Sequence, residues 1–221
     1  NVIPQQTYAD SGKYAYIWGN DARVPNDGVG LPAYQRVVDA NTYDSTGFPY
    51  YLKGDGVNWW MASNSIDFTS VTTLSPFYAV RKFSDSINIP VEIGDSGSRG
   101  ATSLYPNNGA NWAITVLGSA YNQIAYSTYT APISNIISAQ VTTSAANSTA
   151  AISARINGAS VSGTSLISNN STGNFGNQAV NFFRRFNGGY SSNARIYGLI
   201  IRGASSTSTE ISNTETWLNT K

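Results

Sequence analysis

The chain has 221 residues, 41% of them hydrophobic and 11% charged, with a formal net charge of +1 and neither histidine nor cysteine. This length and apolar content suit one domain with a sizeable core, and the low charge indicates a surface of neutral polar residues. Without His and Cys the chain cannot form imidazole or thiolate metal sites, disulfide bonds or a cysteine nucleophile.

The first 45 residues differ from the rest of the chain. Several tyrosines and Trp18 are interspersed there with Asp, Gly and Pro, without a clean period. We expect the segment 1–45 either to add an outer strand and long loops to the same fold or to contact another subunit or the particle. The chain begins with Asn1, and its first residues show no basic segment followed by an apolar one.

Short alternating runs of apolar and polar residues fill most of the remaining chain. β-branched and aromatic residues bounded by turn formers indicate strands. The clearest runs are 77–83, 111–117, 150–156, 179–186 and 196–201, and weaker ones are 123–129 and 136–143. Asn157-Gly158 predicts a tight hairpin turn, because both residues accept a positive φ. This pattern predicts an all-β, two-sheet antiparallel sandwich over residues 46–221.

One α-helix is predicted at the C-terminal end, at about 208–219. Thr207-x-x-Glu210 has the spacing of a capping box. Ile211 and Leu218 follow at helical intervals, so we expect these two side chains to anchor the helix to the sandwich. No apolar run reaches the 18 residues that indicate a membrane-spanning helix.

Several segments resemble one group of proteins. They are LPAYQRV at 31–37, YDSTGFPYYL at 43–52, NSIDFT at 64–69, VRKFSD at 80–85, RIYGLIIRGA at 195–204 and EISNTETWL at 210–218. These segments are similar to the laminin-G-like, concanavalin A-like jelly-roll domains found in tailed-phage and gene-transfer-agent virion proteins. The resemblance covers about residues 31–221 and implies a jelly-roll sandwich at a virion surface.

The chain departs from this group at its usual acidic motif. The group generally reads Phe-Asp-Gly-x-Asp-Asp where this chain reads GDGVNW at 54–59, so Asn58 and Trp59 replace two acids. The calcium site of many laminin-G-like domains is therefore only weakly implied, and we expect no metal or other cofactor. The related glucanases carry a cluster of acids on one strand, and nothing here matches it. We expect Glu92 and Asp95 to be strand-end and turn residues.

The charge distribution also argues against catalysis. Between Asp95 and Glu210 there is no acidic residue, whereas six arginines lie between 96 and 209. Glycoside hydrolysis generally needs two carboxylates facing one bond, so we expect the protein not to be an enzyme. The arginines are too scattered for the clustered basic face of a nucleic-acid site. We expect the charges of the two halves to balance within one fold.

Sugar sites combine aromatic walls with a few fixed polar groups, and three places in the chain fit that description. The first is the pair Trp59 and Trp60, beside Asn58. If Met61 is buried, strand alternation turns Trp59 inward and Trp60 outward. Trp60 then either stacks on a ligand or packs under the N-terminal segment.

The other two places are loops. Arg99, Tyr105, Asn107 and Asn108 around Trp112 form either a hydroxyl-binding set or ordinary hairpin loops over a core tryptophan. Tyr190 lies at the tip of a third loop. The candidate ligand-binding residues are therefore Trp60, Trp59, Asn58, Arg99, Tyr105, Asn107, Asn108, Trp112 and Tyr190.

The sequence thus predicts a non-catalytic virion surface protein, a head spike or tail fibre module that binds host surface polysaccharide. Its expected partners are a host cell-surface glycan and, through the N-terminal segment, other virion proteins; nucleic acid and membrane insertion are not expected. The alternative is a structural capsid or tail decoration protein without a glycan site, whose exposed aromatics contact other subunits. A polysaccharide-degrading enzyme ranks third.

Overall fold

The computed structural model describes residues 51–94 and 100–220. The predicted segment 1–45 and the candidate residue Arg99 lie outside these residues. The described part is an all-β, two-sheet antiparallel jelly-roll sandwich with a C-terminal α-helix, as predicted. Neither of its helices has the length and apolar character needed to cross a membrane.

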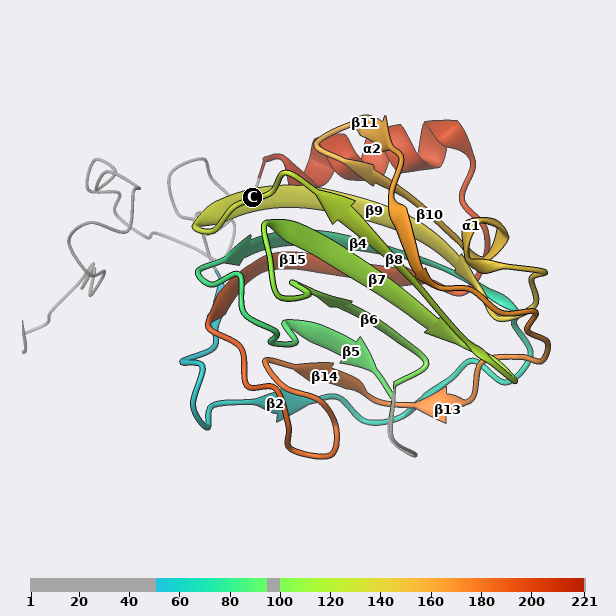
Figure 1. The fold of residues 1–221 in the computed structure, drawn as a ribbon, viewed down its shortest axis with the longest axis horizontal. Coiled ribbons are helices and arrows are strands. Elements are labelled where there is room, and N and C mark those ends of the chain that lie inside the picture. Colours follow the sequence, from blue (N-terminus) through green and yellow to red (C-terminus); the bar gives the residue numbers. More distant parts are fainter. Residues whose placement is uncertain (1–50, 95–99, 221) are drawn as a thin grey trace, which may run out of the picture. The chain divides into compact units, whose positions relative to one another are not determined.

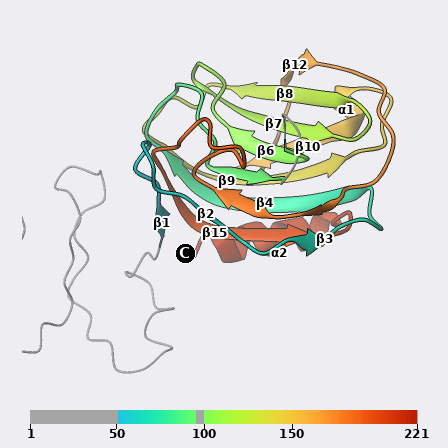
Figure 2. The same cartoon turned by 90° about the horizontal axis from the view of Figure 1, so that it is seen from below.

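Two antiparallel sheets pack face to face (Figures 1 and 2). Sheet A contains, in spatial order, β1 (Leu52–Lys53), β15 (Ala194–Arg202), β4 (Thr73–Lys82), β9 (Ile133–Thr142), β10 (Ile152–Ile156) and β11 (Ala159–Val161). Sheet B contains β12 (Thr164–Ile167), β8 (Tyr121–Ser127), β7 (Asn111–Leu117), β6 (Thr102–Tyr105), β5 (Val91–Ile93), β14 (Val180–Phe182) and β2 (Met61–Ala62). A small third sheet pairs β13 (Asn177–Gln178) with β3 (Ile66–Asp67).

The core lies between the two sheets. Successive side chains of a strand point to opposite faces, and in β7 the side chains of Trp112, Ile114 and Val116 point into the core. Across from them, Tyr78 and Ile137 of sheet A are equally buried. Because the facing side chains of both sheets are large and apolar, their burial supplies the main stabilisation of the sandwich.

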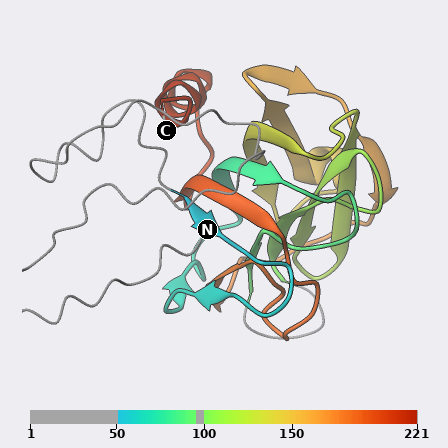
Figure 3. The same ribbon diagram turned by 90° about the vertical axis from the view of Figure 1, so that its left-hand side faces the viewer.

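Helix α2 (Ser208–Leu218) covers the outer face of sheet A (Figure 3). Thr207 and Glu210 form the predicted capping box, with the Thr207 N–H donating to Glu210 Oε2 over 2.8 Å. Leu218 is buried against Phe77 and Ala79, and Ile211 packs on the same cluster, as predicted. A Cβ on Gly198 would lie 2.6 Å from Leu218 Cδ2, so a larger residue at this position would require the Leu218 side chain to move.

The outer face of sheet B carries a second, thinner apolar layer. Ile89, Tyr105, Ala113 and Ala125 are buried there, with the partly buried Ile87 packed on them. Tyr105, Ala113 and Ala125 occupy strand positions next to core residues, and Ile89 precedes β5. Ala113 and Ala125 are directly opposite each other on β7 and β8.

The predicted strands are confirmed with changes at their ends. The run 111–117 is β7, and 77–83, 123–129, 136–143 and 196–201 fall mainly in β4, β8, β9 and β15. The run 150–156 begins in a helical turn, α1 (Ser148–Ala151), because the Asn147 side chain caps it by accepting the Ala150 N–H. The predicted hairpin at Asn157 and Gly158 is present, with φ values of 51° and 81°.

The run 179–186 is a much shorter strand than predicted. It contributes β14, which ends at Phe182 because Phe183 takes a positive φ of 65°. The Phe183 side chain is completely buried, and its N–H donates to the Pro90 carbonyl over 2.9 Å. The chain therefore leaves the sheet at this point and forms the loop that carries Arg185 and Tyr190.

Candidate functional site

A cavity of about 140 Å³ opens on the outer face of sheet B. Four elements line it: the segment before β5, strand β6, strand β8 and the loop after β14. The lining residues are Ile87, Ile89, Tyr105, Tyr121, Gln123, Arg185 and Tyr190. This space holds several water molecules and opens to solvent, so it is large enough to receive a sugar ring and does not by itself limit the length of a ligand.

Gln123 is the amide side chain of the cavity lining. The residue is only 7% exposed, and its amide makes no hydrogen bond within the described part of the chain. Its amide atoms are not among the buried polar atoms that lack a partner, so they are accessible from the cavity side. A carboxamide offers two N–H donors and one carbonyl acceptor, so Gln123 presents both kinds of group to whatever occupies the cavity.

Arg185 forms one wall of the cavity together with Tyr190. The guanidinium carbon lies 4.8 Å from the centre of the Tyr190 ring, a cation–π distance. The loop that carries both residues is tied by the Gly188 N–H to the Arg185 carbonyl and by the Arg185 N–H to the Gly189 carbonyl. Gly188 and Tyr190 both have positive φ values, of 91° and 58°, which turn the loop back over the sheet.

Glu92 lies beneath this wall and compensates the charge of Arg185. Its side chain is fully buried, and its Oε2 accepts from Arg185 Nε over 3.4 Å. Its other oxygen accepts from the Phe186 N–H over 3.1 Å. Burial raises the pKa of the Glu92 carboxyl above its ordinary value, while the Phe186 N–H and the Arg185 charge oppose that rise.

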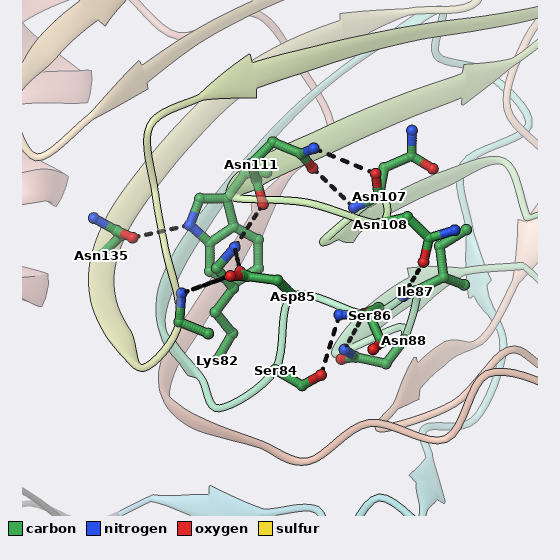
Figure 4. A network of polar contacts seen from close by, with 12 residues as sticks. Lys82, Ser84, Asp85, Ser86, Ile87, Asn88, Asn107, Asn108, Asn111 and Asn135 are labelled. Atoms are coloured by element: carbon green, nitrogen blue, oxygen red, sulfur yellow. Dashed lines mark hydrogen bonds and ion pairs between the residues drawn. The ribbon is translucent and has the colours of Figure 1, made fainter.

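The opposite wall is held in place by a polar network (Figure 4). Asn108 Oδ1 accepts from the Ile87 N–H over 3.0 Å. Asp85 receives Lys82 Nζ at 2.7 Å, and Lys82 also donates to the Asn111 carbonyl over 2.7 Å. The Ile89 N–H donates to the Tyr190 carbonyl over 2.9 Å, which joins the two walls. The cavity is therefore built into the fold before any ligand arrives.

The cavity combines rings, an apolar floor and a few fixed polar groups. No acidic side chain lines it among the described residues, and these residues contain no group of three or more His, Cys, Asp or Glu side chains that could hold a metal ion. Sugar rings have an apolar face and a rim of hydroxyls, and a site of this composition offers contacts to both.

Trp112 is the clearest correction to the sequence-based site. Its side chain is completely buried between the sheets, where its indole N–H donates to Asn135 Oδ1 over 2.9 Å. It lies on the inner face of β7, because it alternates with the outward Asn111 and Ala113. Trp112 therefore contacts the core and cannot contact a ligand. The alternative interpretation, hairpin loops over a core tryptophan, is correct for this residue.

The predicted alternation of Trp59 and Trp60 is also wrong. Met61 is 38% exposed, and Trp59 and Trp60 are 49% and 43% exposed, so neither tryptophan is core. The chain before β2 is not a strand, because Asp55 gathers it into a turn by accepting the N–H groups of residues 57–59. These three bonds, that of Trp59 first, lower the pKa of Asp55.

These two tryptophans contact protein side chains and lie outside the cavity lining. The Arg184 guanidinium carbon is 3.4 Å from the centre of the Trp60 ring, and the Trp59 ring centre is 6.0 Å from that of Phe183. Asn58 is exposed and donates its N–H to Asp55. The structure thus separates this predicted site from the one on sheet B.

The second and third predicted patches meet in one place. Tyr105 and Tyr190 both line the cavity, and Asn108 holds its Ile87 wall. Asn107 donates its N–H to Asn111 Oδ1 over 2.8 Å and so shapes the same loop. Gln123 and Arg185 were not among the residues predicted from the sequence. Glu92, expected at a strand end, is the buried centre of β5.

No protein-family profile matches the chain, and no curated protein sequence matches it. Among solved structures, the Ruminococcus gnavus IT-sialidase CBM40 bound to α2,3-sialyllactose is similar, with 10% identity over 75% of this chain and 97% of that chain and a TM-score of 0.50. At this identity the likeness establishes the fold alone, and it confirms the predicted jelly roll.

Two further solved structures match less closely. A heptameric SAP-like pentraxin from Limulus polyphemus has 9% identity over 75% of this chain and 81% of that chain, with a TM-score of 0.48. Botulinum neurotoxin type C, from a study of its dependence on two gangliosides, has 12% identity over 68% of this chain and a TM-score of 0.48. The chain spans about a third of that toxin chain, 36% of its length.

Proposed function

We propose that this domain binds carbohydrate without cleaving it, with one sugar unit held in the cavity on the outer face of sheet B. The observation that carries the proposal is the Gln123 amide, which is 7% exposed, lines the cavity and has no partner within the described residues. An amide in this position is satisfied when vicinal hydroxyls both donate to it and accept from it.

The aromatic wall supports the same ligand class. Tyr105, Tyr121 and Tyr190 border the cavity, and Tyr190 is 48% exposed, so one face of its ring is available to a ligand. A tyrosine ring stacks on the apolar face of a sugar, and its hydroxyl adds a hydrogen bond. The resemblance to virion jelly rolls supports the finer proposal of a head spike or tail fibre module that binds host surface polysaccharide.

A pair of matched variants tests the site. Tyr190→Ala should lower the affinity for a bound oligosaccharide about fivefold, since an aromatic contact contributes about 1 kcal/mol. Trp217 of helix α2 is 49% exposed, nearly the same as Tyr190, but lies over the other sheet. Trp217→Ala should therefore leave the affinity unchanged. The affinities are measured by calorimetry, with ligands chosen from a glycan array of bacterial surface polysaccharides.

The outcomes separate the functional classes. Binding that weakens in both variants equally, or in neither, would remove the cavity as the site. Each binding experiment includes a reducing-end assay on the same polymer, and new reducing ends would overturn the non-catalytic part of the proposal. Antibodies against the domain should label intact particles of the source virus, and particles without this chain would contradict the virion placement.

One observation favours the structural alternative. Large apolar side chains gather before and in β2 and β3, where Val57 is 74% exposed, Trp59 49%, Trp60 43%, Met61 38% and Ile66 40%. Contiguous exposed apolar surface is typical of a contact with another protein. If the glycan array shows no binding, we expect this surface to contact other subunits, as in a capsid or tail decoration protein. Crosslinking mass spectrometry on particles would then recover residues 57–66.

A further inference from the structure

A β-bulge interrupts the edge of sheet B beside the cavity. Strand β12 is the outermost strand of this sheet and pairs with β8 (Figure 2). Ser165 lies opposite Ile124 of the core. The register then shifts, and Ile167 lies opposite the cavity residue Gln123. Leu166 is therefore the extra residue of the bulge. Bulges are common at sheet edges and next to active sites, where they re-aim a side chain.

The bulge leaves a large apolar side chain at the surface. Leu166 is 43% exposed, and Ile167 is half-buried. On the same strand, Thr164 is exposed and lies opposite Ala125 of the outer apolar layer. We call Thr164, Leu166 and Ile167 the ledge. Next to Gln123, the ledge offers two apolar side chains and one hydroxyl, which suit the apolar face and the hydroxyl rim of a sugar.

The ledge is held in place by the elements around it. The hydroxyls of Ser165 and of Ser148 in α1 share a hydrogen bond over 2.6 Å. After the strand, Asn169 donates its N–H to Asn122 Oδ1 over 2.7 Å and its side-chain N–H to the Tyr121 carbonyl over 2.6 Å. The bulged strand is thus tied both to α1 and to β8. A ligand meets an ordered surface, so contact with it costs little conformational entropy.

The arrangement of the walls directs a longer ligand toward β12. The Ile89 N–H donates to the Tyr190 carbonyl, so the segment before β5 and the loop after β14 are joined. Strand β8 is the lining strand nearest to this edge of sheet B, and among the described strands only β12 lies beyond it. A sugar chain that leaves the cavity past Gln123 therefore passes over the ledge.

We propose that the cavity and the ledge are consecutive subsites, and that the ligand is an oligosaccharide of at least two units. One unit lies beside Gln123 in the cavity, and the next lies on Leu166 and Ile167. This inference rests on the proposed carbohydrate-binding function and adds the length of the ligand to it. Leu166 is then the specificity-determining residue that makes the protein prefer a chain to a single sugar.

The wild-type protein provides the first test. Fragments of one, two and three units are prepared by partial hydrolysis of the bacterial surface polysaccharide that gives the strongest glycan-array signal. NMR titration measures their affinities. The two-unit fragment should bind about fivefold more tightly than the one-unit fragment, a difference of about 1 kcal/mol. A third unit should add less than about twofold, because β12 is the last strand at this edge of the sheet.

The variant Leu166→Ala provides the second test. It should lower the affinity for the two-unit fragment about fivefold and leave that for the one-unit fragment unchanged. Leu52→Ala is the matched control, because Leu52 is 37% exposed and lies on β1, an edge strand of sheet A. It should change neither affinity. Tyr190→Ala should weaken both fragments by the same factor, which separates the cavity from the ledge.

The possible results are distinct. Equal affinity for the one-unit and two-unit fragments, or a gain that persists in a folded Leu166→Ala protein, overturns the inference while leaving carbohydrate binding intact. An equal loss for both fragments in Leu166→Ala also overturns the second subsite. If Leu166→Ala does not fold, saturation-transfer NMR on the wild-type protein decides, and a signal from only one unit of the two-unit fragment contradicts the inference. No array signal overturns the proposed function, and this inference with it.

Discussion

At the scale of single residues, Gln123 offers hydrogen-bonding groups that folding leaves free for a ligand. Gln123 is 7% exposed and lines the cavity, but its amide atoms are not among the buried polar atoms that lack a partner, so they keep access to water. A ligand hydroxyl that replaces this water regains the hydrogen bonds that the amide makes to solvent.

The variant Gln123→Leu tests this interpretation. It should change the free energy of unfolding by less than about 1 kcal/mol, because no internal hydrogen bond is lost, and it should weaken oligosaccharide binding about tenfold. Gln140 is the control, because its Nε2 donates to the Ser206 carbonyl over 3.0 Å. Gln140→Leu should lower stability and leave binding unchanged. Urea unfolding and calorimetry measure both quantities, and a loss of stability in both variants would contradict the interpretation.

At the scale of elements, the segment between β4 and β5 depends on one ion pair. Lys82 is fully buried, and Asp85, which is 28% exposed, also accepts the Ala131 N–H with both carboxylate oxygens at 3.1 Å. Burial lowers the pKa of Lys82, and Asp85 opposes that effect. The same segment leads into Ile87 of the cavity wall, so this pair links the stability of the sandwich to the shape of the site.

Two substitutions at this pair should differ in their effect. Asp85→Asn leaves a buried ammonium group without its counterion. Breaking a fully buried pair in this way lowers the free energy of unfolding by ~3–5 kcal/mol, and the loss here should be somewhat smaller because Asp85 is partly hydrated. Lys82→Met leaves Asp85 in contact with water and the Ala131 N–H, so its cost should be smaller.

The stability deficit of Asp85→Asn should also depend on pH. Without its counterion, the pKa of Lys82 falls further below its unfolded value, so stability rises as the pH rises through the folded pKa and the neutral amine forms. The deficit should therefore shrink in alkaline solution. Urea unfolding at neutral pH measures the free energy of unfolding of both variants. If Asp85→Asn and Lys82→Met lose the same amount, the ion pair has no role beyond packing.

At the scale of the whole molecule, the sequence predicted the fold better than the site. A long alternating run such as the one that forms β7 is enough to indicate a strand. The capping box likewise lies within four neighbouring residues, so it indicates the start of α2 without knowledge of the rest of the fold. Strands β5 and β6 have three and four residues, too few for a period to be recognised. Trp112 was ambiguous because β7 is buried on both faces, and period alone does not show which face meets the core.

The cavity could not be predicted because it depends on sheet register. Glu92 meets Arg185 only because β5 pairs with β14. Gln123 and Tyr105 line one cavity only because β6, β7 and β8 are neighbours in the sheet. One signal was present: Ala113 and Ala125 replace the polar residues expected on an outward strand face. Small residues at such positions indicate that something covers them, here the tyrosine and isoleucine walls.

Because residues from distant parts of the chain build the cavity, only the folded molecule can bind the ligand, and binding should raise the thermal stability of the whole domain. An oligosaccharide ligand at 100 times its Kd should stabilise the folded state by about 2.7 kcal/mol. For a domain of this size the melting temperature should rise by roughly 5–10 °C. At the same ligand concentration, the melting temperature of Tyr190→Ala should rise by about 2–4 °C less than that of the wild type. The reason is that a ligand bound more weakly stabilises the folded state less. Calorimetric scans of both proteins with and without ligand measure this, and equal shifts would place binding elsewhere on the molecule.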